Sequence, residues 1–176
     1  MAFDLQPTLR GELLTLAPLV PADFEALFAA AADPLIWEQH PASDRHEDGP
    51  FRAFFAESIN LGGALVARDT RDGRIIGSSR FHNYDEAHDE IEIGWTFLVR
   101  SHWGGQYNGE MKRLMLRHAF RFVGRVVFLI GPQNYRSQRA IEKIGGARAG
   151  LRHDADGRES VVYEIRSAVP NNVRQR

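Results

Sequence analysis

Residues 90–110 read EIEIGWTFLVRSHWGGQYNGE, and this stretch decides how the rest of the chain is interpreted. Its first part, residues 90–99, is rich in isoleucine and aromatic residues, which is typical of a strand. Residues 100–109 form a glycine-bearing loop. Residues 110–122, EMKRLMLRHAFRF, carry apolar side chains at helical spacing, and the apolar run VVFLI at 126–130 is typical of a strand covered on both faces. The order strand, glycine loop, helix and strand predicts a mixed α/β domain.

The flanking segments extend this pattern in both directions. Before residue 90 we expect a strand at 9–19, helices at 22–32 and 50–58, and strands at 64–69 and 74–83. After residue 130 we expect a helix at 136–144 that ends at Gly145-Gly146, then a hairpin of 147–153 with 160–166. The predicted fold class is therefore α/β (α+β), with a mixed, mainly antiparallel central sheet of about seven strands flanked by about four helices. We expect a single domain over residues 1–166 and a frayed tail at 167–176.

Composition excludes several classes of protein. The 176 residues are 43% hydrophobic and 26% charged, which excludes a disordered or low-complexity chain. The absence of cysteine excludes disulfides, thiolate metal sites and cysteine nucleophiles. No apolar run is long enough to span a membrane, and the N-terminus does not read as a secretory signal, so we expect a cytoplasmic protein. The histidines lack metal-ligand spacing, so we expect no metal, and His118 on the apolar helix face is expected in the core.

Charge is distributed unevenly along the chain. Residues 1–99 carry a net charge of -10, residues 100–143 a net +7 and residues 144–176 a net +2. This division suggests one anionic and one cationic partner, although such blocks also arise on ordinary solvated surfaces. The near-neutral total argues against a general nucleic-acid binder.

The glycine loop is a candidate anion site. The first N–H groups of a helix have no partners within the helix, and the helix dipole favours negative charge there. Gly104, Gly105 and Gly109 would let the backbone approach a diphosphate closely. The spacing matches neither a P-loop nor a dinucleotide-binding fingerprint, and glycines alone would also fit a plain connecting loop.

Two motifs at the right separation resemble those of the GNAT (Gcn5-related) N-acetyltransferases, and within that superfamily the RimJ/RimL-like branch. The branch's loop, Trp-Gly-Lys-Gly-Tyr-Ala-Thr-Glu-Ala, is matched by Trp103, Gly104, Tyr107 and Glu110. The second motif, Asn-x-x-Ser-x-x-Ala, is matched by Asn134, Ser137 and Ala140, followed by Lys143 and Gly145. Two positions depart from the family. Gln106 stands in place of the second loop glycine, and Ile141 stands where many members carry a tyrosine that acts as general acid.

The resemblance implies acetyl-CoA as donor and a primary amine as acceptor, with direct attack, no acyl-enzyme and no metal. It also implies a homodimer. The implied cofactor-binding residues are Phe97, Leu98, Val99, Arg100, Gly104, Gly105, Gln106, Tyr107, Asn108, Gly109, Asn134, Ser137 and Arg139. The first three would offer backbone groups to pantetheine at a place where the strand splays from its neighbour. Phosphate charges would be met by basic residues from the set Arg100, Lys112, Arg136, Arg139 and Lys143.

Glu92 is the candidate general base, because the resemblance places it where several members carry one. Strand alternation would put Glu90, Glu92, Gly94 and Thr96 on one face and Ile91, Ile93 and Trp95 on the other. The two glutamates could equally line a solvated strand face. Ser137 is a second catalytic candidate, which could bond the cofactor or the leaving thiolate, or cap its helix.

The function expected from the sequence is therefore an acetyl-CoA-dependent N-acetyltransferase that acts on a protein N-terminus or a small amine. The acidic first half would favour a cationic acceptor. Three other functions fit the same residues: acetylation of an aminoglycoside or polyamine, non-catalytic binding of acyl-CoA, and a structural α/β protein without a ligand. We expect no nucleic-acid or membrane partner.

Overall fold

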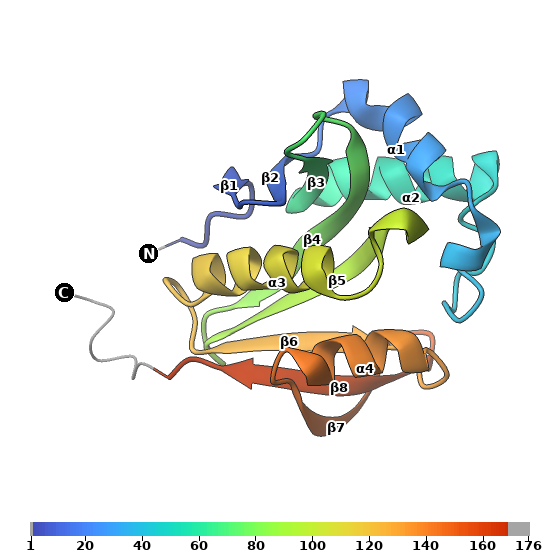
Figure 1. Ribbon diagram of the computed structural model, residues 1–176. Helices are drawn as coiled ribbons and strands as arrows, with labels where there is room; N and C mark the ends of the chain where they lie inside the picture. Colours follow the sequence, from blue (N-terminus) through green and yellow to red (C-terminus); the bar gives the residue numbers. More distant parts are fainter. Residues whose placement is uncertain (1, 169–176) are drawn as a thin grey trace.

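The computed structural model describes residues 2–168, so most of the tail expected at 167–176 lies outside the described residues. Eight strands and four α-helices form the fold (Figure 1). The strands are β1 (Leu9–Arg10), β2 (Leu14–Pro18), β3 (Ala64–Asp69), β4 (Ile75–Asp85), β5 (Glu90–Leu98), β6 (Arg125–Ile130), β7 (Ala147–His153) and β8 (Glu159–Arg166). The α-helices are α1 (Phe24–Ala31), α2 (Asp48–Leu61), α3 (Gln106–Ala119) and α4 (Tyr135–Lys143), with short 3₁₀ turns η1 (Pro21–Asp23), η2 (Pro34–Ile36) and η3 (Arg100–His102).

All strands belong to one sheet with the order β1-β2-β3-β4-β5-β6-β8-β7. Every neighbouring pair is antiparallel except β5 and β6, which are parallel because α3 connects them. The mixed, mainly antiparallel sheet and the four helices confirm the predicted fold class. Within residues 2–168 no helix is both long and apolar enough to cross a membrane.

The sheet separates two hydrophobic cores. The first contains side chains of α3 and Ile141 of α4, together with Ile91 and Ile93 of β5. The second contains side chains of α1 and α2, together with Phe97 of β5. The two cores therefore place α3 and α4 on one face of the sheet and α1 and α2 on the other, and Figure 1 shows α3 lying in front of the strands with α2 behind them. His118 is buried in the α3 core as expected, where its Nε2 lies 2.7 Å from the carbonyl oxygen of Asp4.

A β-bulge in β5 changes which side chains share a face. Ser78 pairs with Phe97 but Arg80 pairs with Gly94, so β5 holds one extra residue opposite β4, and Trp95 adopts a positive φ of 51°. Trp95 packs with the α2 core, whereas the Thr96 hydroxyl is bonded by a lysine of α3. The predicted alternation is therefore wrong beyond Gly94: Thr96 faces α3, and Trp95 lies on the face that carries Glu92.

Element boundaries differ from expectation at two instructive places. The strand expected at 9–19 is a hairpin of β1 and β2, whose turn residues Glu12 and Leu13, with Leu14 of β2, donate backbone hydrogen bonds to the buried carboxylate of Glu110. The helix expected at 110–122 begins earlier, at Gln106, so the second half of the predicted loop is the first turn of α3. The glycines at 104 and 105 lie just before that turn.

Candidate active site at the split between β5 and β6

The parallel strands β5 and β6 separate part of the way along their length. Their pairing runs from Glu90 opposite Arg125 to Glu92 opposite Val127, and the second half of β5 is paired with β4 alone. Figure 1 shows the two strands diverging toward the loop that carries η3. The backbone of Phe97 and Leu98 thus lies on the part of β5 that has left β6, as the resemblance implied. The bulge at Trp95 lies at the start of this split.

Glu90 and Glu92 have different surroundings near the split. Glu90 is held by two ion pairs, to Arg125 at 2.7 Å and to Arg152 at 2.9 Å, so its charge is neutralised by the fold. Glu92 is buried, and among the described residues it accepts one hydrogen bond, from the Asn83 amide at 3.3 Å. Burial raises the pKa of the Glu92 carboxyl to about 7, against the opposing effect of the Asn83 bond. Glu92 can therefore exchange a proton near neutral pH, as a general base requires.

Lys112 does not serve as a phosphate partner. Its side chain is buried between α3 and the sheet, where Nζ donates to Thr96 Oγ1 and, at 3.4 Å, to Ser79 Oγ. Burial lowers the pKa of the Lys112 amine to about 7. The Nζ atom also lies 5.7 Å from the centre of the Phe128 ring on β6. The lysine thus lies on the α3 side of the split, since Thr96 and Phe128 belong to the two separated strands.

The N-terminus of α3 offers unpartnered backbone donors. Its N-cap is Gly105, which has no side chain to accept a hydrogen bond from the first turn. Gly104 and Gly105 have φ values of 109° and 106°, which side-chain-bearing residues rarely adopt. A Cβ atom at either position would have no neighbour within 4 Å, so the space beside this turn is open. An anion can therefore approach the first-turn N–H groups of Gln106, Tyr107 and Asn108.

A buried carboxylate fastens this loop to the β3–β4 hairpin. Asp69 lies 2.8 Å from His102 Nε2 and accepts a hydrogen bond from the Tyr107 hydroxyl at 3.2 Å. Arg71 pairs with the same carboxylate at 2.7 Å, and these contacts hold the pKa of Asp69 well below its usual range. The Tyr107 hydroxyl thus helps to hold the loop against the hairpin, a structural role that sequence motifs alone did not indicate.

The N-terminus of α4 is capped by its own sequence. The Asn134 side chain accepts a hydrogen bond from the Ser137 N–H at 3.2 Å, so Asn134 is the capping residue and Ser137 is not. Within residues 2–168 the Ser137 hydroxyl has no hydrogen-bond partner. Arg139 and Lys143 are exposed and have no acidic partner in the described part of the chain, so both can meet an external anion.

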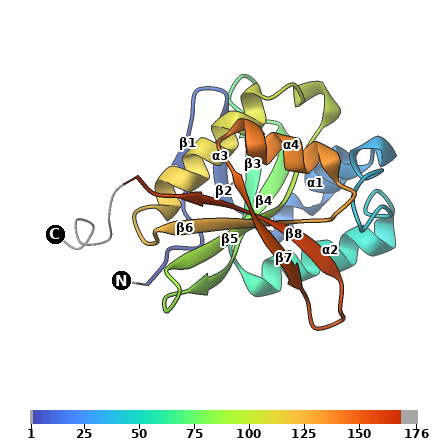
Figure 2. The ribbon, with the colours of Figure 1, turned by 90° about the horizontal axis from the view of Figure 1, so that it is seen from below.

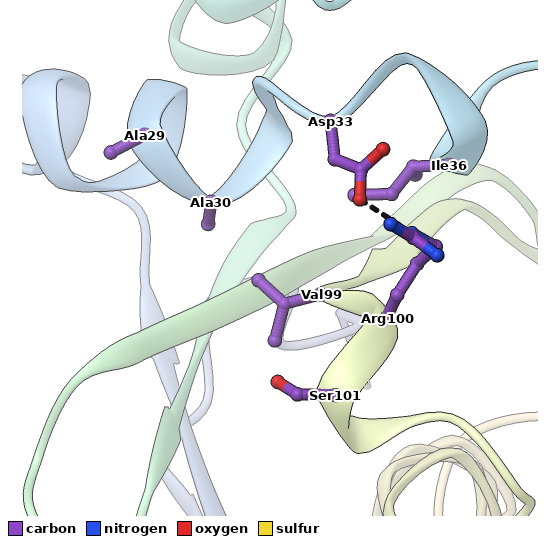
Figure 3. A pocket seen from close by; sticks show the side chains of 7 residues that line it. All are labelled: Ala29, Ala30, Asp33, Ile36, Val99, Arg100 and Ser101. Atoms are coloured by element: carbon purple, nitrogen blue, oxygen red, sulfur yellow. Dashed lines mark hydrogen bonds and ion pairs between the residues drawn. The ribbon is translucent and has the colours of Figure 1, made fainter.

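Arg100 and Arg136 are paired with acidic residues of the segment that follows α1. Arg100 Nε donates to Asp33 at 2.5 Å, and Figure 3 shows this pair at the edge of a pocket of about 540 Å³. Val99 and Ser101 also line the pocket, opposite Ala29, Ala30 and Ile36. Arg136 lies 3.4 Å from Glu38 and 4.3 Å above the Trp103 ring. Arg100 uses only its Nε in this pair, so its Nη groups are available to a phosphate, whereas both Nη groups of Arg136 are engaged with Glu38 and the Ile36 carbonyl.

Other candidate groups can be placed from the same contacts. No cluster of three or more histidine, aspartate or glutamate side chains in residues 2–168 could hold a metal ion. Ile141 is buried in the α3 core, so this position offers no proton donor. Sequence patterns did not indicate the roles of Asp69 and Glu110, because their partners lie far away in the sequence and no local pattern marks them.

Comparison with known proteins agrees with this geometry. The family model for the acetyltransferase (GNAT) domain matches residues 14–147. Among solved structures, the acetyltransferase from Agrobacterium tumefaciens str. C58 is 28% identical, with a TM-score of 0.70 over 95% of this chain and 98% of that one. Two more distant structures show the fold alone: a GCN5-related N-acetyltransferase from Brucella melitensis (18% identity, TM-score 0.75, 92% and 79% covered) and Mycobacterium smegmatis RimJ in complex with CoA-disulfide (19%, 0.69, 92% and 86%).

No curated protein sequence matches the chain. The family model nevertheless covers most of the sequence, including the split strand, the glycine loop and the start of α4. The chain therefore belongs to the GNAT family of acetyltransferases.

Proposed function

We propose that this acetyltransferase moves an acetyl group from acetyl-CoA to a primary amine, which attacks the thioester directly. The observation that carries the proposal is the position of Glu92, a buried carboxylate at the start of the split with a pKa near 7. An acceptor amine is protonated at neutral pH, since its pKa is about 8 for an α-amine and about 10.4 for a lysine-like amine. A base at this position removes the proton that blocks attack.

The chain has residues suited to each part of the donor. The open N-terminus of α3, from Gly104 to Gly109, would bind the diphosphate through backbone N–H groups. The backbone of Phe97 and Leu98 would pair with the pantetheine arm on the separated part of β5. Val99 follows the strand, and its N–H and C=O are bonded to Ile76 and His102, so it is a weaker candidate than the resemblance implied. Arg139 and Lys143 supply free positive charge beside α4. When bound, acetyl-CoA supplies the activated acyl group. A CoA compound in a structural neighbour, M. smegmatis RimJ, supports this choice of donor.

The reaction then requires few groups of the chain. Glu92 accepts a proton from the acceptor ammonium. The neutral nitrogen would then form a bond to the acyl carbon while the carbon–sulfur bond breaks, and the second proton that the nitrogen loses would neutralise the leaving thiolate. The Ser137 hydroxyl, which has no partner within residues 2–168, donates a hydrogen bond to the leaving sulfur. Holding both reactants at the split supplies much of the acceleration, because the bimolecular step becomes effectively unimolecular.

The acceptor is a protein N-terminus or a small amine that enters from the α1–α2 face. That face carries Glu92, and a structural neighbour described as a ribosomal-protein-serine acetyltransferase from Vibrio cholerae supports a protein acceptor. We further propose that the chain acts as a single domain and as a homodimer.

Two measurements test the proposal together. Thermal unfolding with increasing CoA should show stabilisation of about 2.7 kcal/mol when CoA reaches 100 times its dissociation constant. Release of free thiol from acetyl-CoA should depend on an added amine, with the acetylated product identified by mass spectrometry. CoA binding without amine-dependent thiol release would support the non-catalytic alternative, and no thermal shift at millimolar CoA would exclude the proposed donor site.

A further inference from the structure

A buried arginine on the α1–α2 face has unsatisfied hydrogen-bonding capacity. Arg80 of β4 is 1% exposed, and its Nε and Nη1 atoms are buried without a hydrogen-bond partner among the described residues. Its Nη2 donates to the Ser58 hydroxyl, and Nη1 forms a long ion pair of 3.5 Å with the exposed Glu57. A buried guanidinium whose Nε has no partner and whose Nη1 has only this long contact is costly, so the site has capacity for a further acceptor.

A second guanidinium lies close to the first. Arg45 is half-buried, 4.5 Å above the Phe54 ring, and Arg80 lies 5.7 Å from the same ring. Burial and the nearby charge of Arg80 lower the pKa of Arg45 to about 10. The carboxylates that act on Arg45, those of Glu57 and Asp44, belong to exposed residues, and Arg158 adds a further positive charge. Glu57 acts on both arginines, but it is exposed, so the two positive groups favour a further negative group nearby.

The pair lies beside the reaction site. Arg80 is paired in register with Gly94, and its guanidinium lies 4.5 Å from the ring of Trp95, the bulge residue at the start of the split. Glu92 lies on the same face of β5, close enough for the charge of Arg80 to act on its carboxyl. An anion bound by Arg80 would therefore lie on the same face of the sheet as the general base and near it.

We infer that Arg80 and Arg45 bind an acidic group of the acceptor, so that the substrate carries a carboxylate close to its amine. This inference rests on the proposed function and specifies its acceptor. Such a carboxylate belongs either to a free amino acid or to an acidic side chain near a peptide N-terminus. In both, the guanidiniums orient the acidic group while the amine meets Glu92. The acceptor class differs from the cationic one that the charge of residues 1–99 favours, because folding brings the arginines of that half together.

Matched acceptor pairs test the inference by binding and by turnover. The pairs are alanine with alaninamide, and the peptide Ser-Asp-Ala-Ala amide with Ser-Asn-Ala-Ala amide, each measured by calorimetry in the presence of CoA and by thiol release from acetyl-CoA. A charge-assisted bond to arginine predicts about ten- to hundredfold tighter binding of one acid over its amide partner. The pair that shows the preference identifies which source of carboxylate the site takes.

Variants separate this role from a structural one. Arg45→Met should remove most of the preference for the acid. Arg52→Met is the matched control, since Arg52 lies on α2 over the Phe24 ring, away from β5, and should keep the full preference. Glu57→Gln removes the carboxylate that competes for Arg80 and should tighten binding of the acid. Because Arg80→Lys could unfold the chain, Arg45→Met and Glu57→Gln carry the test.

The outcomes for the two proposals can be told apart. Turnover of acid and amide with equal efficiency would overturn the inference and leave the acetyltransfer proposal intact. Acid-selective binding without thiol release would support the inference and contradict the proposed reaction. Failure of all four acceptors to bind at millimolar concentration would overturn the inference, whatever other amine is acetylated.

Discussion

Two buried ionisable groups lie near the split on opposite faces of the sheet, and burial shifts their pKa values in opposite directions. Glu92 lies on the sheet face covered by α1 and α2, and its pKa rises to about 7. Lys112 projects from α3 on the other face, and its pKa falls to about 7. Burial disfavours the charged form in each case, so an acid becomes weaker and an amine becomes less basic. At neutral pH both groups exchange protons readily, which is unusual for a glutamate and a lysine.

Replacing Glu92 by glutamine should remove one limb of the pH–rate profile. The wild-type kcat should rise through pH 7 as the carboxylate forms, because only the ionised form accepts a proton. Glu92→Gln should lower kcat by about 100- to 10,000-fold and leave only the rise from the acceptor amine itself. Stopped assays from pH 5.5 to 9.5 test this, and Glu90→Gln is the control. Activity of Glu92→Gln within about threefold of wild type at every pH would show that Glu92 is not the general base.

Asn83 should tune the same group. The hydrogen bond that its side-chain amide donates to Glu92 stabilises the ionised carboxylate. Removing the amide should therefore raise the pKa of Glu92 further and move the rise of kcat to higher pH. Asn83→Gly is the suitable variant, because Asn83 has a φ of 49° that glycine adopts without strain. An unchanged limb would show that the Asn83 bond is absent in the working enzyme.

Lys112 gives a stability prediction whose sign follows from linkage. The pKa is about 7 when folded and about 10.4 when unfolded, so between these values the unfolded chain binds more protons and stability rises with pH. The penalty is therefore fully present below pH 7 and is lost as the pH rises toward 10. Lys112→Met lacks the penalty, so its free energy of unfolding relative to wild type should be most favourable near pH 7 and should decline by pH 9. Urea titrations at both pH values measure the difference, and equal differences would contradict the predicted burial of charge.

At the scale of elements, Glu110 connects α3 to the β1–β2 hairpin. Its carboxylate accepts three backbone hydrogen bonds, from Glu12, Leu13 and Leu14, and Gly11 leaves room for it, since a Cβ there would collide with the carboxylate. Glu110→Ala leaves those donors unpaired and should cost about 3 kcal/mol or more of unfolding free energy. Glu110→Gln keeps an acceptor and should cost less. Equal unfolding midpoints for the two variants in urea would refute this role.

Sequence patterns predicted the existence of elements better than their connections. The α3 segment was expected because Leu114, Met115 and His118 recur at helical spacing, and all three are buried. The start of the helix was placed too late, because the polar and glycine residues from Gln106 to Gly109 are typical of a loop. In this protein they form the first turn of α3, with Gly105 as the N-cap. The bulge at Trp95 could not be predicted, because nothing local distinguishes a tryptophan at positive φ from one in a regular strand. Lys112 was expected to meet a phosphate, but its burial depends on Ser79 of β4 and Thr96 of β5, which are distant in the sequence.

At the scale of the whole molecule, one carboxylate couples acid stability to the cofactor loop. The pKa of Asp69 is lowered chiefly by its hydrogen bonds to Arg71. The stabilising effect of the carboxylate is therefore fully present above pH 4 and falls progressively as the pH drops below the pKa of a free carboxyl group. Asp69→Asn should therefore destabilise the protein at pH 7 and by a slightly smaller amount at pH 3, because most of the effect persists until the pH nears the much lower folded-state pKa. It should also weaken CoA binding, because His102 and Tyr107 lose their contact with the carboxylate. Unfolding and CoA titrations at pH 7 test both effects, and a variant with normal stability there would contradict them.

The free edge of the sheet has a consequence for how molecules of this protein meet one another. Strand β7 ends the strand order beside β8 (Figure 2), every one of its residues is exposed, and its backbone could template another chain. Gly150, at a φ of 129°, shifts the register and interrupts the flat ladder. The exposed Arg148 places positive charge on this edge, whereas the charge of Arg152 is paired with Glu90. Resistance to open-ended polymerisation thus depends in part on one glycine that has no part in the chemistry.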